Sequence, residues 1–125
     1  MKQGSDHLAN RITSLWEAVP DTLADKECTE ILASGKDVRV ERIVSKGHSS
    51  PDQFWYDSDQ AEWVALLSGE AKLRFKEQDV QVHLKPGDHL TIAPHQEHRI
   101  EWTTPDQPTV WLAVYFSVPP QATES

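Results

Sequence analysis

The spacing of apolar residues predicts one short helix near the start of the chain. Cys28, Ile31 and Leu32 recur at i, i+3 and i+4, which places them on one face of a helix. Asp25 is a suitable N-cap for this helix, and Gly35 follows it as a stop. We expect its apolar stripe, including Cys28 as a small buried hydrophobe, to pack against a larger unit.

From Val38 onward apolar and polar residues alternate, which is typical of half-buried strands. The alternating runs are Val38-Val40, Ala71-Leu73-Phe75, Val80-Val82-Leu84, Leu90-Ile92, Ile100-Trp102 and Val110-Leu112-Val114-Phe116. Turn-forming residues separate the runs at 68–70, 77–79, 85–88, 93–95 and 105–108. About eight short strands with frequent turns favour a sandwich or a barrel.

One run, from Trp63 to Leu67, is apolar at every position, which predicts a strand covered on both faces and therefore two layers. Glu62 stands at the start of this strand. A carboxylate there would be costly to bury without a cation or a proton beside it. We therefore expect another group to neutralise Glu62.

Length and charge narrow the class of protein. A chain of 125 residues suits one domain. Twelve basic and twenty acidic side chains give a net charge of -8, which disfavours nucleic acid and anionic membranes as partners. A single cysteine excludes an internal disulfide and fits a reducing compartment, and no apolar run resembles a signal peptide or a membrane span, so we expect the cytoplasm.

The histidines carry the most chemical information. His98 shares strand parity with Ile100 and Trp102, so its imidazole points inward if those two residues face the core. It is then either a core histidine bonded to a backbone carbonyl, or a metal ligand or general base. Asp57 lies a few residues before Glu62, so carboxylates could converge with His98.

At these residues the sequence resembles the cupin superfamily over about Val38 to Phe116. Six residues separate Glu62 from Gly69, as in the first cupin motif, and His98 lies eleven positions after Gly87, as in the second. The resemblance implies an all-β double-stranded β-helix, the cupin jelly-roll barrel, here preceded by the short N-terminal helix. We expect an N-terminal segment at 1–37, the barrel at 38–117 and a mobile tail at 118–125. The resemblance to cupins also implies a homodimer.

The chain departs from the cupin pattern at several positions. Trp55 and Asp57 occupy the places of the two histidines of the first motif. His95 replaces a motif glycine, and Trp102 stands where the motif has an asparagine.

Two interpretations of these departures remain open. In a rebuilt site, Asp57, Glu62 and His98 hold a divalent Mn, Fe, Ni or Zn ion, with His95 as a fourth ligand or proton shuttle. In a lost site, Glu62 and His98 form a hydrogen-bonded pair without a metal. In either case Trp55 and Trp102 would lie near the barrel mouth and could stack on a flat or sugar-like ligand.

The resemblance thus implies a small single-domain cupin of undefined activity that binds a divalent metal and a small molecule in the barrel mouth. Its reaction would be that of a metal-dependent isomerase, oxygenase or decarboxylase, since this fold hosts all three. The alternative is a metal-free cupin that binds or senses a ligand without catalysis.

Overall fold

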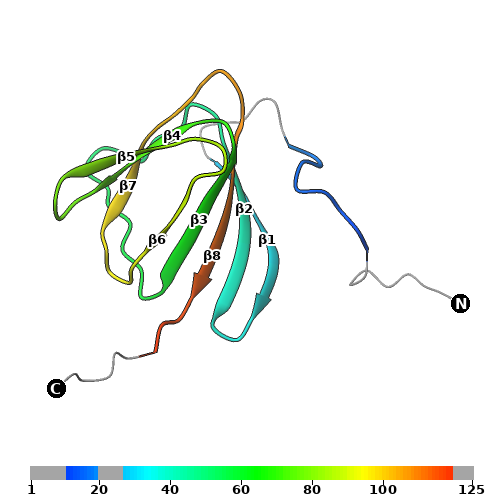
Figure 1. Ribbon diagram of the computed structural model, residues 1–125, viewed down its shortest axis with the longest axis horizontal. Coiled ribbons are helices and arrows are strands. Elements are labelled where there is room, and N and C mark those ends of the chain that lie inside the picture. Colours follow the sequence, from blue (N-terminus) through cyan, green and yellow to red (C-terminus); the bar gives the residue numbers. More distant parts are fainter. Residues whose placement is uncertain (1–10, 20–26, 120–125) are drawn as a thin grey trace, which may run out of the picture.

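The computed structural model describes residues 11–19 and 27–119, and eight strands form its framework (Figure 1). They are β1 (Cys28–Gly35), β2 (Val38–Ser45), β3 (Ala61–Ser68), β4 (Ala71–Phe75), β5 (Val80–Leu84), β6 (His89–Ile92), β7 (His98–Thr103) and β8 (Thr109–Phe116). The described residues contain no helix that has the length and hydropathy of a membrane crossing. The expected all-β jelly-roll architecture is confirmed.

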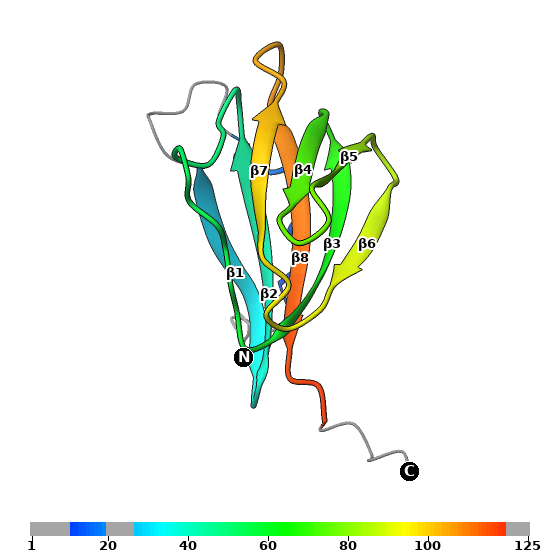
Figure 2. The same ribbon diagram turned by 90° about the vertical axis from the view of Figure 1, so that its left-hand side faces the viewer.

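The strands form two sheets whose inner faces enclose the core (Figure 2). One sheet has the order β1-β2-β8-β3-β6, and the other has the order β5-β4-β7. Neighbouring strands are antiparallel throughout. The core cluster draws on both sheets and comprises Val64, Leu66, Ala71, Leu73, Leu84, Ile92 and Trp111.

Strand β3 is buried on its inner face, whereas its other face is only partly covered, since Trp63 and Leu67 there are half-buried; the cover that its apolar sequence predicts on both faces is therefore incomplete. It lies between β8 and β6 in the larger sheet. Leu66 is fully buried and Val64 is 3% exposed. The start of β3, where Glu62 stands, is therefore held by hydrogen bonds to a strand on each side.

The helix expected over Cys28 to Gly35 is wrong, because this segment is β1, an edge strand paired with β2. A β-bulge between Ile31 and Ala33 shifts the register, so the apolar residues do not alternate strictly and their spacing imitates that of a helix. Every residue of β1 is exposed, including Cys28, which corrects its expected burial. The N-cap expected at Asp25 lies outside the described residues.

The larger sheet thus begins inside the segment expected to precede the barrel. Residues 11–19 lie beside β2, where Arg42 donates hydrogen bonds to the carbonyls of Leu15 and Glu17, at 3.0 and 2.7 Å. Arg42 is itself only 7% exposed. Of the tail expected at 118–125, residues 120–125 lie outside the described part of the chain.

The turn between β3 and β4 requires glycine. Gly69 has a φ of +87°, and a methyl group there would lie 2.5 Å from the Cα of Thr109 on β8. Gly87, in the turn before β6, has a similar φ of +95° but open space around it. A substitution at Gly87 therefore tests backbone strain alone, whereas one at Gly69 adds a steric clash with Thr109.

We expect Gly87→Ala to lower the free energy of unfolding by about 1–2 kcal/mol, the cost of a left-handed backbone conformation. Gly69→Ala should cost about 1–3 kcal/mol more, because it also forces β8 away from the turn. Urea unfolding of both variants measures the difference. Equal midpoints would show that Thr109 yields freely.

Candidate functional site

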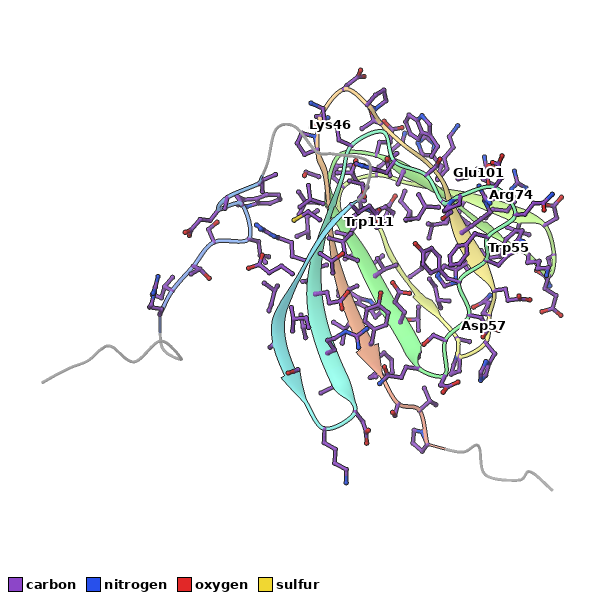
Figure 3. The ribbon with its side chains drawn as sticks, turned by 180° about the vertical axis from the view of Figure 1, so that it is seen from behind. Lys46, Trp55, Asp57, Arg74, Glu101 and Trp111 are labelled. Atoms are coloured by element: carbon purple, nitrogen blue, oxygen red, sulfur yellow. The ribbon has the colours of Figure 1, made fainter. Side chains whose placement is uncertain are left out.

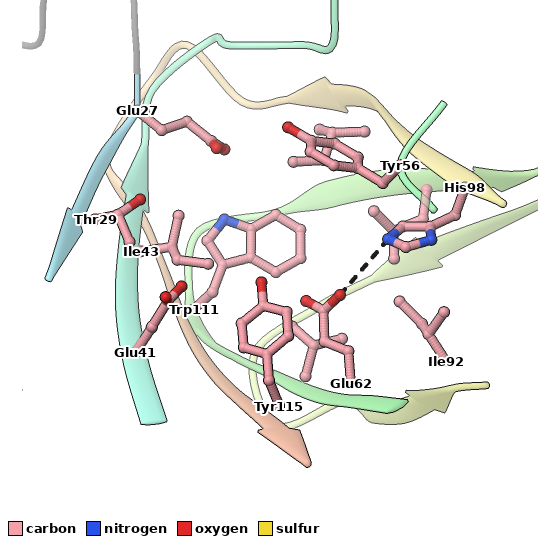
Figure 4. A pocket seen from close by; sticks show the side chains of 13 residues that line it. Glu27, Thr29, Glu41, Ile43, Tyr56, Glu62, Ile92, His98, Trp111 and Tyr115 are labelled. Carbon is pink, nitrogen blue, oxygen red and sulfur yellow. Dashed lines mark ion pairs between the residues drawn. The ribbon is translucent and has the colours of Figure 1, made fainter. Parts of the chain in front are cut away.

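A cavity of about 180 Å³ lies between the two sheets (Figure 4). Its lining is mostly apolar, with a small set of acidic, phenolic and imidazole groups. The residues that line it are Glu27, Thr29, Glu41, Ile43, Tyr56, Glu62, Val64, Leu73, Ile92, His98, Ile100, Trp111 and Tyr115. An apolar pocket with a few convergent polar groups is the usual form of a small-molecule site.

Glu62 and His98 meet inside this cavity. Glu62 lies near the start of β3 and His98 at the start of β7, and these two strands belong to different sheets. The Oε1 atom of Glu62 lies 3.6 Å from the Nε2 atom of His98, and the two side chains are 15% and 9% exposed. This distance makes an ion pair and is longer than a direct hydrogen bond. The group expected to neutralise Glu62 is thus His98, whose inward orientation follows from its burial.

The orientation of the His98 ring is fixed from its other side. Its Nδ1 atom donates a hydrogen bond to the carbonyl of Gln96 at 2.9 Å, so Nε2 is the atom presented to Glu62. Burial alone lowers the pKa of His98, but interaction with Glu62 and the Gln96 carbonyl outweighs it and raises the pKa above the ordinary value of about 6.5.

Two tyrosines flank the pair. The ring of Tyr56 stacks on His98 with centroids 5.6 Å apart, and the two residues also form an isolated β-bridge. Burial, followed by the nearby charges of Glu62 and Glu41, raises the pKa of Tyr115 well above its usual range. Burial, followed by the charge of Glu27, also raises the pKa of Tyr56. Both phenols therefore stay protonated at neutral pH.

The other end of the cavity is acidic. Glu41 on β2 is 8% exposed and pairs with Arg39 on the same strand. Glu27, just before β1, accepts a hydrogen bond from the hydroxyl of Ser45. That hydroxyl in turn accepts a hydrogen bond from the indole N–H of Trp111 at 3.1 Å. Figure 4 shows the indole of Trp111 between this acidic end and the Glu62–His98 end.

Asp57 and His95 form a separate pair that does not line the cavity. The Nδ1 atom of His95 lies 2.8 Å from the carboxylate of Asp57, and its Nε2 atom lies 3.5 Å from that of Asp59. The side chains of His95 and Asp57 are 64% and 49% exposed. The hydrogen bond with Asp57 is the main cause that raises the pKa of His95.

The structure therefore brings Glu62 and His98 together, and brings Asp57 and His95 together, but does not bring all four residues into one cluster. Over residues 11–19 and 27–119, no group of three or more His, Cys, Asp or Glu side chains could hold a metal ion. A catalytic metal site usually has three protein ligands. The residues present do not fit the ligand set that the resemblance implies, and metal binding stays a prediction.

Trp55 and Trp102 also lie outside the cavity lining. A bulge in β7 pairs Ile100 with Leu73 but Trp102 with Lys72, which turns Trp102 to the face opposite His98. Its ring lies 5.3 Å from the ammonium group of Lys72. Trp55 lies near Lys76 and Arg99, on the β7 side of the molecule, whereas Trp111 lies between the sheets (Figure 3).

The aromatic residues that do line the cavity are Tyr56, Trp111 and Tyr115, and sequence reasoning missed all three. On β8 the stronger apolar alternation falls on the even positions, but the odd positions Trp111 and Tyr115 face the cavity. The sequence does carry a signal for this face of β8, because the polar groups of tryptophan and tyrosine suit a cavity with polar lining better than a fully apolar core.

We expect nuclear magnetic resonance titration of the imidazole protons to give His98 a pKa above about 6.5, and Glu62→Gln to move that pKa below this value, since burial then dominates. His95 serves as the internal control, because its partner Asp57 is unchanged. An unaltered His98 titration in Glu62→Gln would contradict the pairing.

The same pair makes stability depend on pH. Because the folded-state pKa of His98 is raised, its contribution is complete below the unfolded value of about 6.5 and is lost as pH rises through the folded value. The stability advantage of the wild type over Glu62→Gln, measured by urea unfolding, should therefore shrink as pH rises above about 6.5.

Comparison with known proteins agrees with this geometry. The model of the cupin domain family matches residues 40–115. A search of curated proteins found no match. A candidate mannose-6-phosphate isomerase from Ralstonia eutropha JMP134 is 39% identical, with a TM-score of 0.82 over 86% of this chain and 99% of its own.

Two more distant structures share the fold. A cupin superfamily protein from Desulfitobacterium hafniense is 19% identical, with a TM-score of 0.64 over 79% of this chain and 84% of its own. A cupin 2 conserved barrel domain protein from Salinispora arenicola is 18% identical, with a TM-score of 0.63 over 86% and 89%. Because the family model spans most of the barrel and the Ralstonia protein aligns over nearly its full length, this chain belongs to the cupin family.

Proposed function

We propose that this cupin binds a small organic molecule in the cavity between its sheets, against the Glu62–His98 pair and without a metal ion. The observation that carries the proposal is the burial of two ionisable groups that face each other across part of a mostly apolar cavity. Keeping such groups buried is costly for a purely structural core. A bound ligand gives them a use.

The pair is suited to holding or moving a proton on that ligand. The two groups are 3.6 Å apart, which is too far for a direct hydrogen bond. Each group therefore keeps a hydrogen-bonding position that a ligand hydroxyl or amine can take. Neutral His98 accepts a proton at Nε2, and protonated His98 returns it, while Glu62 holds the imidazolium in place. Interaction with Glu62 raises the pKa of His98 above its ordinary value of about 6.5, which favours the imidazolium that can return a proton to the ligand.

The Ralstonia relative is named for the isomerisation of a sugar phosphate. A phosphate group usually requires lysine or arginine donors. The described residues that line this cavity include three glutamates and neither of those basic residues. We therefore propose a ligand other than a sugar phosphate for this chain.

Filling the cavity mouth tests the proposal. Thr29 lines the cavity from the exposed edge strand β1, so Thr29→Phe should occupy ligand space with little effect on the core. Small molecules that raise the melting temperature of the wild type should lose this effect in Thr29→Phe. They should keep it in the control Thr29→Val, because valine is close in size to threonine. Equal shifts in all three proteins would place binding elsewhere.

A metal centre is the second candidate, favoured by the orientation of the His98 Nε2 atom toward the Glu62 carboxylate. Under our proposal, elemental analysis of untagged protein finds the same low metal content in wild type and His98→Ala. Stoichiometric metal that is lost in His98→Ala would overturn the metal-free proposal. Asp57→Asn would then show whether the exposed Asp57–His95 pair contributes.

A further inference from the structure

The charge of the cavity lining restricts the kind of molecule that it accepts. Three carboxylates line it, from Glu27, Glu41 and Glu62. Arg39 neutralises one of them, and protonated His98 neutralises a second. The third, Glu27, accepts its hydrogen bond from a neutral hydroxyl. The lining thus keeps a net negative charge in either protonation state of His98.

Burial strengthens this electrostatic preference. Glu41 and His98 are 8% and 7% exposed, and most of the remaining lining is apolar. Charges interact more strongly in such an environment than in water, so an entering anion is repelled and an entering cation is attracted. The net charge of -8 on the whole chain acts in the same direction during encounter.

The aromatic lining is an independent observation that also favours a cation. Tyr56, Trp111 and Tyr115 present rings to the cavity, and Trp111 is 3% exposed. The face of an aromatic ring attracts ammonium groups, most strongly when both are removed from water. Arg39 already uses the ring of Tyr115 in this way, with its guanidinium carbon 4.4 Å from the ring centroid.

The arrangement of these groups separates two ends of the cavity. Glu27 and Glu41 lie at one end and the Glu62–His98 pair lies at the other, with Trp111 between them (Figure 4). The cavity volume of about 180 Å³ is below the ~300–1,000 Å³ of drug-sized sites, so the ligand must be small.

From this geometry we infer that the ligand is a small organic cation, an amine or quaternary ammonium compound. Its charged group lies over Trp111 between Glu27 and Glu41, and its other end faces Glu62 and His98. This inference rests on the proposed function, since it names the class of ligand that the same cavity takes.

Probes matched in size but differing in charge test the inference at constant ionic strength. We would titrate the protein with butylammonium and choline as cations, butanol as the neutral probe and butyrate as the anion, and follow tryptophan fluorescence and melting temperature. At least one cation should bind at least about tenfold more tightly than butanol, and butyrate should bind most weakly.

Removing single carboxylates tests where the cation lies. Glu27→Gln and Glu41→Gln should each weaken cation binding several-fold and leave butanol binding unchanged, which also reports an intact cavity. Glu77→Gln removes the same charge from an exposed turn and should change neither. Loss of cation affinity that is equal in all three variants would overturn the assignment to the cavity.

Other outcomes separate this inference from the proposed function. Butanol or butyrate binding as tightly as both cations would overturn the cationic ligand, and the cavity would remain a binding site. Absence of binding by either cation would also overturn it, and the Thr29 variants would then judge independently whether the cavity binds any molecule.

Discussion

The burial of Glu62 at the start of β3 is the constraint on which the site depends. Strands β8 and β6 flank this position, and the chain around it is apolar, so the carboxylate must find its partners inside the barrel. His98 provides one from the opposite sheet. The two sheets are thereby tied at one level by an electrostatic contact as well as by packing, and a polar site persists within a hydrophobic core.

The segment before β3 explains how the site differs from the pattern that the sequence implies. Trp55 and Asp57 match the places of the two motif histidines, but Tyr56 is the residue that faces the cavity. A change of one residue in an extended segment turns every side chain to the other face. Backbone hydrogen bonds between Tyr56 and His98 at 2.7 and 3.2 Å fix this register. The ring of Tyr56 therefore stacks on His98, and the side chains at the two motif positions do not line the cavity.

The fold and the central pair could be predicted from sequence because they depend on spacing. Alternation locates most strands, and the distances from Glu62 to Gly69 and from Gly87 to His98 identify the pair. The rest depends on irregularities that no simple period encodes. A bulge in β7 turns Trp102 away from the face of His98, and another bulge gives β1 the apolar spacing of a helix. Such features are determined by pairing with a neighbouring strand.

The acidic character of the cavity follows from where the chain uses its arginines. Arg42 is buried against residues 11–19, with hydrogen bonds to two carbonyls there and an ion pair with Glu30. Arg99 donates hydrogen bonds to the carbonyls of Ser50 and Pro51, which fixes the loop that presents Tyr56. These guanidinium groups stabilise backbone segments outside the cavity, so they are not available to neutralise the carboxylates within it. The same distribution of charge that anchors the loops of this small barrel therefore leaves the lining of its cavity with a net negative charge.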